Sequence, residues 1–218
     1  MKTKAYKGIG MEGPIARWYA RITRRDLVEV KALARRVSEE LVEQARVLEV
    51  APGPGYFAIA LAQLGKYKVT GLDISETFVD MARQHAREKG VEIDFRHGNA
   101  SDMPFAEGSF DRIVCRAAFK NFTDPVGALR EMHRVLRRGG RAVIIDLRKD
   151  APQRDIDAYV EKMNVGRVNA AFIKLTFRLV LLKRAYTRED FQCFIAKSGF
   201  SKSEIADAPM GFDITLIR

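Results

Sequence analysis

Short apolar runs alternate with longer amphipathic stretches along the middle of the chain, from Arg46 onward. Apolar runs bounded by glycine or proline predict buried strands, and apolar residues spaced three or four apart predict helices. The predicted strands are 47–51, 69–72, 91–96, 110–115 and 142–146, and the predicted helices are 56–64, 75–89 and 125–136. Strands that alternate with helices form βαβ units, so this pattern predicts an α/β fold with a doubly wound, mostly parallel sheet.

The two ends of the chain follow a different pattern. Residues 14–45 predict one or two helices before the first strand, and 152–186 predict a long helical insertion after the fifth. A last helix at 188–198 and two short strands, 200–206 and 211–217, close the sequence. We therefore expect a single domain, 1–218, that consists of an N-terminal helical lid (1–45), a core (46–147), a helical lid insertion (148–186) and a closing segment (187–218).

Composition bounds the class of protein. The chain has 218 residues, of which 47% are hydrophobic, enough to form a packed core. The longest apolar runs, such as 179–182, are far shorter than a membrane-spanning helix, and the N-terminus lacks the apolar region of a secretory signal, so we expect a cytoplasmic protein. Cys115 and Cys193 lie far apart within apolar stretches, which predicts buried thiols and no metal site.

The net charge of +10 is concentrated at the two ends of the chain. Residues 1–46 carry 11 basic and 6 acidic side chains, residues 47–147 carry 14 and 13, and residues 148–218 carry 13 and 9. The surpluses are thus +5, +1 and +4. Cationic flanks suit an anionic partner, which leaves open a substrate, a membrane surface or RNA, beside the alternative of a merely solvated basic surface.

The strongest local signal is a glycine turn between a predicted strand and a predicted helix. Gly53 and Gly55 bring backbone amides of the helix start to the edge of the sheet, where phosphates and other ligands bind. Asp73 ends the next strand, where a carboxylate accepts hydrogen bonds from two ribose hydroxyls. Alternatively, the two glycines only form a tight turn between strand and helix, and Asp73 caps the next helix beside Ser75. These residues alone leave open an NAD-dependent oxidoreductase and a non-catalytic nucleotide-binding module.

Four segments resemble class I S-adenosylmethionine-dependent methyltransferases, closest to the type 11 or quinone-biosynthesis-like branch. They are EVAPGPG at 49–55, GLDIS at 71–75, and the stretches 98–119 and 128–146. The resemblance covers about residues 46–147 and implies a Rossmann-like, seven-stranded sheet, S-adenosylmethionine as cofactor and methyl transfer to a small-molecule acceptor. Ala51 stands where the family usually has glycine, so we expect a turn with negative φ there.

The resemblance also implies roles for individual residues. The implied cofactor site consists of Tyr19, Glu49, Ala51, Gly53, Gly55, Asp73, Ile74, Gly98, Asn99, Ala100 and Arg116. Glu49 would hold the amino group of the methionine end, Asp73 the ribose, and Ile74 would pack on the adenine. Asn99 stands where relatives often carry aspartate, and its carbonyl oxygen keeps the hydrogen bond without charge assistance. Tyr19 resembles a lid tyrosine, with packing of the first helix as the alternative.

The acceptor side is less well defined by the sequence. Methyl transfer requires alignment and a dry cavity, and a base only if the acceptor arrives protonated, so the sequence leaves the catalytic residue unassigned. Lys120 and Asn121 occupy positions where relatives place substrate-facing groups, and His97 is a further candidate. The apolar and basic stretch 170–186 predicts either a core-packing lid or a lid that contacts an apolar, anionic substrate or a membrane surface.

One alternative uses the same chemistry. The basic flanks also permit an RNA or protein methyltransferase. The segment after the fourth predicted strand, Arg116-Ala117-Ala118-Phe119, lacks the Asn/Asp-Pro-Pro-Tyr/Phe pattern of amino-group methyltransferases, and no separate RNA-binding module is visible. We therefore favour a small-molecule acceptor and expect no DNA partner, and RNA stays open.

Overall fold

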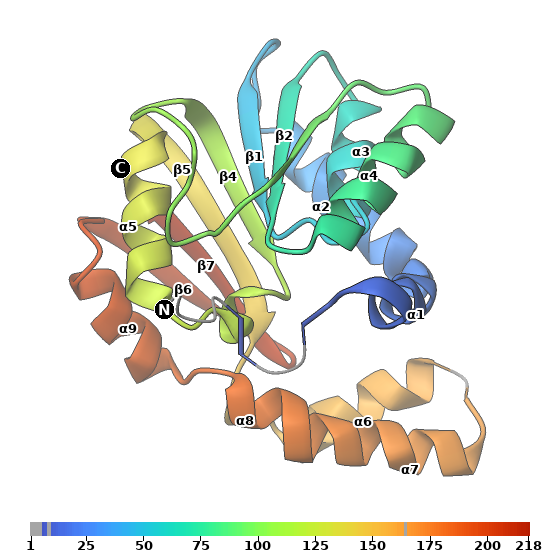
Figure 1. The fold of residues 1–218 in the computed structure, drawn as a ribbon. Coiled ribbons are helices and arrows are strands. Elements are labelled where there is room, and N and C mark those ends of the chain that lie inside the picture. Colours follow the sequence, from blue (N-terminus) through green and yellow to red (C-terminus); the bar gives the residue numbers. More distant parts are fainter. Residues whose placement is uncertain (1–5, 8–9, 164) are drawn as a thin grey trace.

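The structure is a computed structural model that describes residues 6–7, 10–163 and 165–218. Within these residues, seven strands form one sheet in the order β3-β2-β1-β4-β5-β7-β6 (Figure 1). They are β1 (Arg46–Val50), β2 (Lys68–Asp73), β3 (Asp94–His97), β4 (Phe110–Arg116), β5 (Leu136–Leu147), β6 (Lys202–Ala208) and β7 (Gly211–Ile217). Strands β1 to β5 pair in parallel, and β7 pairs antiparallel with both β5 and β6. The predicted doubly wound, mostly parallel α/β sheet is confirmed.

Helices cover both faces of this sheet (Figure 1). The helices of the described residues are α1 (Gly13–Thr23), η1 (Arg24–Asp26), α2 (Leu27–Ser38), α3 (Tyr56–Ala62), α4 (Glu76–Glu88), η2 (Phe119–Asn121), α5 (Pro125–Val135), α6 (Gln153–Lys162), α7 (Arg167–Thr176), η3 (Phe177–Leu181), α8 (Leu182–Arg184) and α9 (Arg188–Ala196). One apolar layer lies between the sheet and α5 and α9, where Met132 and Phe191 are buried. The other lies under α2, α3 and α4 and includes Leu33, Leu61 and Val79.

The segments outside the sheet gather at one end of it. Figure 1 shows α1 and the group α6 to α8 beyond the carboxyl ends of the parallel strands, where ligands bind in open α/β sheets. The insertion after β5 folds back on itself, with α6 against α7. Ile156, Val160 and Phe177 form a small apolar core of their own within it. Residues 14–45, as expected, contain two helices ahead of β1.

Two expectations were wrong in detail. The strand predicted at 142–146 is longer, because β5 begins at Leu136 and includes Gly139 and Gly140, whose backbones exchange hydrogen bonds with Arg218 just after β7 (2.8 and 3.2 Å). Cys193 is exposed on α9, whereas Cys115 is buried as expected. Among the described residues, no helix is both long and apolar enough to span a membrane.

Candidate functional site

The loop between β1 and α3 carries three residues in the left-handed region. Ala51, Gly53 and Gly55 have φ values of +58°, +54° and +80°. The expected negative φ at Ala51 was wrong: its N–H donates to the carbonyl of Leu72 at 2.8 Å, a bond that fixes the turn despite the strain of a side chain there. A Cβ on Gly53 would meet nothing within 4 Å, so this turn borders open space.

Gly55 is required by packing as well as by its φ angle. A Cβ there would lie 2.9 Å from Cβ of Ala82 on α4 and 2.9 Å from the ring of Phe95 on β3. Because real Cβ atoms do not approach so closely, α3 can start at this depth only after glycine. The missing Cβ at Gly55 thus allows the start of α3 to pack against α4 and β3.

Glu49 is a buried carboxyl at the centre of this edge of the sheet. Its side chain is 4% exposed, and Oε2 accepts a hydrogen bond from the N–H of Ala58 at 3.0 Å. Burial raises the pKa of Glu49 to about 8, the charge of Asp73 adds to this rise, and Arg116 and the Ala58 N–H oppose it. A buried carboxyl with so high a pKa favours a cationic partner, which would restore its ionised form.

Asp73 lies beside it at the end of β2 and is also buried. Its Oδ2 accepts from the N–H of Gly53 and its Oδ1 from the N–H of Ser75, both at 2.9 Å. Burial raises the pKa of Asp73 to about 6, although these hydrogen bonds hold it down. The side chain that caps α4 is Ser75, which accepts from Phe78. Each Asp73 oxygen therefore keeps a lone pair for a ligand hydroxyl.

The ends of β2 and β3 supply an apolar and a polar group. Ile74 is 38% exposed, an uncommon degree for a large apolar side chain at a sheet edge. His97 is exposed, and its Nε2 lies 3.1 Å from the carbonyl of Ile74. Oδ1 of Asn99 accepts from the N–H of Ser101 at 3.0 Å, which leaves one lone pair and the NH₂ group of this amide. Gly98 and Ala100 flank it and are half-buried.

Arg116, at the end of β4, reaches toward the N-terminal helices. Its Nη2 lies 3.8 Å from a carboxylate oxygen of Glu29 and 4.0 Å from one of Asp26. Tyr19 on α1 is close to the same guanidinium: burial raises the pKa of Tyr19 and the charge of Arg116 lowers it. Its ring also contacts Phe78, with centroids 5.9 Å apart. The contact with Phe78 packs α1 against α4, and the role of Tyr19 as a lid over the cofactor stays a prediction.

A buried ion pair links the ends of β4 and β5. Nζ of Lys120 lies 2.8 Å from Oδ1 of Asp146, and the two side chains are 6% and 1% exposed. The backbone N–H of Lys120 donates to the other oxygen of Asp146 at 2.8 Å, and Nζ also donates to the carbonyl of Ala117. The sequence placed Lys120 among the substrate-facing positions after the fourth strand. It did not predict the ion pair with Asp146 that buries this side chain.

Tyr6 is a residue of this site that no pattern in the sequence marks. It forms a β-bridge with Phe122, and the neighbouring Lys7 N–H donates to the carbonyl of Asn121 at 2.8 Å. Burial raises the pKa of Tyr6, and the charges of Arg184 and Lys120 lower it. Arg184 belongs to the end of the lid insertion and Lys120 to η2.

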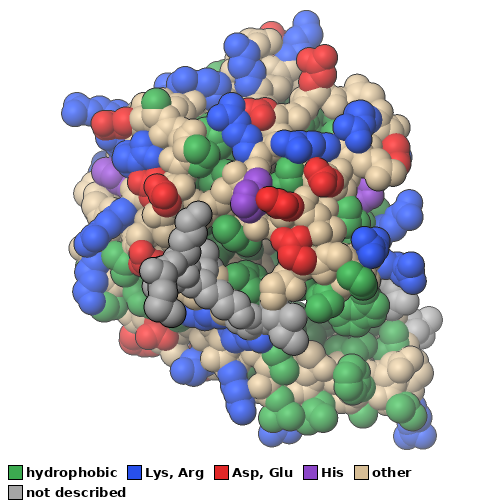
Figure 2. Space-filling view, in the orientation of Figure 1, with side chains coloured by type: hydrophobic (Ala, Val, Ile, Leu, Met, Phe, Trp, Pro, Cys, Tyr) green, Lys and Arg blue, Asp and Glu red, His purple; other side chains and the backbone are tan. Residues whose placement is uncertain are grey.

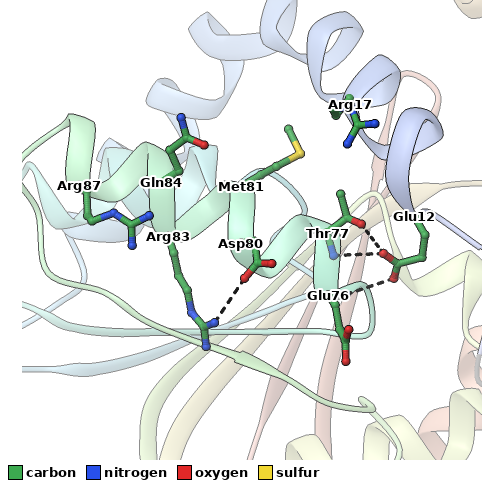
Figure 3. Close-up of a pocket in the computed structure, with 9 residues that line it drawn as sticks. All are labelled: Glu12, Arg17, Glu76, Thr77, Asp80, Met81, Arg83, Gln84 and Arg87. Atoms are coloured by element: carbon green, nitrogen blue, oxygen red, sulfur yellow. Dashed lines mark hydrogen bonds and ion pairs between the residues drawn. The ribbon is translucent and has the colours of Figure 1, made fainter.

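A hollow of about 710 Å³ lies outside this site, between α1 and α4 (Figure 3). Its lining is formed by Glu12, Arg17, Glu76, Thr77, Asp80, Met81, Arg83, Gln84 and Arg87. The carboxylate of Glu12 accepts from the N–H groups of Glu76 and Thr77, both at 3.1 Å, so it covers the start of α4. The hollow lies on the outer, charged side of α4 and includes none of the expected cofactor residues.

Comparison with known proteins agrees with this geometry. A family described as "Methyltransferase domain" matches residues 48–144. A demethylmenaquinone methyltransferase of Chlorobaculum tepidum is 30% identical over 180 residues, which are 80% of this chain and 72% of that protein. One of Deinococcus radiodurans is 41% identical over 102 residues, 46% of this chain, and the match spans only 42% of that relative's length.

A solved structure shares the whole fold. A protein of Methanococcus maripaludis assigned as an S-adenosyl-L-methionine-dependent methyltransferase superposes with a TM-score of 0.78, covering 99% of this chain and 97% of that one. At 20% identity, this likeness shows the fold alone. The strand order and the glycine turn between β1 and α3 are those of a class I, Rossmann-like fold. The chain belongs to the S-adenosylmethionine-dependent methyltransferase family, whose methyl donor is S-adenosylmethionine.

Proposed function

We propose that this chain transfers the methyl group of S-adenosylmethionine to a small, apolar aromatic acceptor of the phenol or quinol class. The observation that carries the proposal is the pair of buried carboxyls, Glu49 and Asp73, at the ends of β1 and β2 beside the glycine turn at Gly53, where an added Cβ would meet nothing within 4 Å. The acceptor class is supported by the relatives named demethylmenaquinone methyltransferases. The other features of acceptor recognition are assigned from residues of this chain.

The residues at the strand ends fit S-adenosylmethionine in chemistry and order. We assign to its binding Tyr19, Glu49, Ala51, Gly53, Gly55, Asp73, Ile74, Gly98, Asn99, Ala100 and Arg116. Glu49 matches an ammonium group because it is buried and, within the part of the chain that the structure describes, only one of its carboxyl oxygens accepts a hydrogen bond. The remaining lone pairs of Asp73 match two ribose hydroxyls, and the exposed side chain of Ile74 matches an adenine ring.

The protein's part in the reaction is alignment. S-adenosylmethionine supplies a methyl group on a sulfonium, whose carbon–sulfur electron pair stays on sulfur while the acceptor takes the methyl group and loses a proton to water. Glu49 and Asp73 fix the two ends of the donor, which sets the direction of attack. The α1 helix and the lid insertion lie beyond this end of the sheet and limit the access of bulk water to the reacting groups.

The acceptor's polar end would meet the groups around Tyr6. The phenol of Tyr6, the guanidinium of Arg184 and the ammonium of Lys120 are close enough to influence one another. The positive charges of Arg184 and Lys120, which lower the pKa of this phenol, favour an anionic or strongly polarised oxygen near it. The ion pair with Asp146 holds that ammonium in place.

Methyl-labelled S-adenosylmethionine tests the proposal directly. The protein is incubated with a reduced 2-prenyl-1,4-naphthoquinone, its oxidised form, transfer RNA and a lysine-rich peptide. We expect label in the reduced quinol only, and much less label with Asp73→Ala at limiting S-adenosylmethionine, whereas the exposed-surface variant Lys89→Ala should retain activity. Label in RNA or peptide without label in the quinol would overturn the proposed acceptor and favour the RNA or protein alternative.

A further inference from the structure

One face of the helix formed by α7 and η3 carries apolar side chains that remain exposed. Val168, Phe172, Leu175 and Leu179 are spaced four, three and four residues apart, so they form one stripe along the helix. Their side chains are 84%, 69%, 51% and 51% exposed. We name this stripe the lid face. Proteins that work as free monomers rarely expose such a stripe, so the lid face indicates a partner.

The opposite side of the same helix is already occupied. Ile173 and Phe177 pack against Ile156 and Val160 of α6 and form the small core of the insertion. The expectation that this segment is a core-packing lid therefore holds for one side of the helix only. The lid face points away from that core, and its exposure shows that it does not line a closed acceptor site.

Basic residues border the lid face. Residues 165–186 contain five Lys and Arg side chains and no Asp or Glu. Lys174 pairs with a carboxylate of α6 at 2.6 Å, whereas Arg167, Arg178 and Lys183 are exposed. A helix with an apolar stripe and a cationic border has the character of one that lies in the interface of an anionic bilayer.

We propose that the lid face docks on an anionic phospholipid surface. A second amphipathic element supports this: α1 exposes Ile15 and Trp18 to 42% and 60%, next to Arg17 and Arg21. Hydrophobic side chains gather over α1 and again over α7 on one face of the molecule, with Lys and Arg at the edges of both groups (Figure 2). A second copy of the chain is a poorer occupant, because two lid faces would bring like charges together.

Docking in this orientation has a consequence for the reaction, which rests on the proposed function. The lid insertion and α1 lie beyond the carboxyl ends of the strands (Figure 1). The proposed cofactor and acceptor site at these strand ends would therefore lie close to the membrane. A prenylated acceptor could then enter from the lipid without crossing water. The docking itself does not depend on which acceptor is methylated.

Vesicle co-sedimentation without any acceptor tests the docking. The probes are phosphatidylcholine vesicles with and without phosphatidylglycerol, at low and high salt. We expect binding to the anionic vesicles only, weakened by salt and reduced about tenfold or more in Phe172→Ser/Leu175→Ser and in Arg178→Glu/Lys183→Glu. The matched controls, Val42→Ser/Leu64→Ser and Lys66→Glu/Lys89→Glu, change equally exposed residues at the opposite edge of the sheet and should bind as the wild type does.

Calorimetric binding of S-adenosylmethionine to each variant confirms that it is folded. Equal binding of the wild type and the lid-face variant to anionic vesicles would overturn the proposal, and so would absence of binding by the wild type. A wild-type dimer that the lid-face variant turns into a monomer, without vesicle binding, would assign the lid face to a second copy instead. Failure of quinol methylation with intact vesicle binding would contradict only the proposed acceptor.

Discussion

Cofactor affinity should depend on pH through Glu49. Its pKa of about 8 means that about one molecule in a hundred has this carboxylate ionised at pH 6, and about one in four at pH 7.5. If the ionised form holds the donor's ammonium group, affinity should rise about 25-fold over that range. Asp73, with a pKa of about 6, adds a factor of about two at the lower end. The ligand's own ammonium stays mostly protonated below pH 7.5.

The variant Glu49→Gln separates this effect from every other titration. An amide resembles the protonated carboxyl, so the variant should bind about as well as the wild type at pH 6 and about 10-fold or more worse at high pH. Isothermal titration calorimetry at half-unit steps of pH measures both curves. A wild-type affinity that stays flat from pH 6 to 7.5, or a variant with the same slope, would refute the role of Glu49.

The same pKa predicts how the ligand-free protein responds to pH. Burial raises the pKa of Glu49 above its ordinary value of 4.5, so the folded state favours the protonated form. Its contribution to the free energy of unfolding is fully present below pH 4.5 and is lost as pH rises through about 8. Thermal unfolding should therefore show Glu49→Gln gaining stability over the wild type between pH 6 and 9, and an unchanged difference across that range would contradict the buried acid.

Three further predictions concern single contacts. Asp73→Ala should weaken S-adenosylmethionine binding about 10- to 150-fold without unfolding the protein, because charge-assisted hydrogen bonds to two hydroxyls are lost. An unchanged calorimetric Kd would leave Asp73 only a structural role, as the acceptor of the Gly53 N–H. Ala51→Gly should relieve the strain at φ +58° and raise the free energy of unfolding in urea by about 0.5–1 kcal/mol, and a loss of stability would show that the turn is relaxed with alanine. Lys120→Met should cost about 3–5 kcal/mol in the same assay because Asp146 keeps a buried, unpaired charge, and adding Asp146→Asn should recover part of that loss; a single variant as stable as the wild type would refute the ion pair.

Local patterns predicted the sheet because they determine it. Strands such as Val47–Val50 are buried on both sides, and the glycine turn that follows them is required by packing at Gly55, whose missing Cβ lets α3 approach α4. Such requirements act within a few residues or through a residue type that has no substitute. The positions of the strands and of the helices α4 and α9 follow from this.

The parts that the sequence could not predict depend on distant partners. The φ of Ala51 is set by a bond to Leu72, and the extension of β5 by bonds to Arg218. Tyr6 enters the site only because its backbone pairs with the segment at Phe122. Spacing predicted the apolar stripe that contains Phe172, but periodicity cannot tell whether a stripe faces a core or the surroundings.

Calorimetric titration of the purified chain with S-adenosylmethionine and, separately, with NAD tests the central claim most directly. The buried acids at Glu49 and Asp73 and the open turn at Gly53 predict binding of S-adenosylmethionine in the micromolar range, one per chain, and no heat with NAD. Binding of NAD without any response to S-adenosylmethionine would contradict the account and return the chain to the oxidoreductase or nucleotide-binding alternatives.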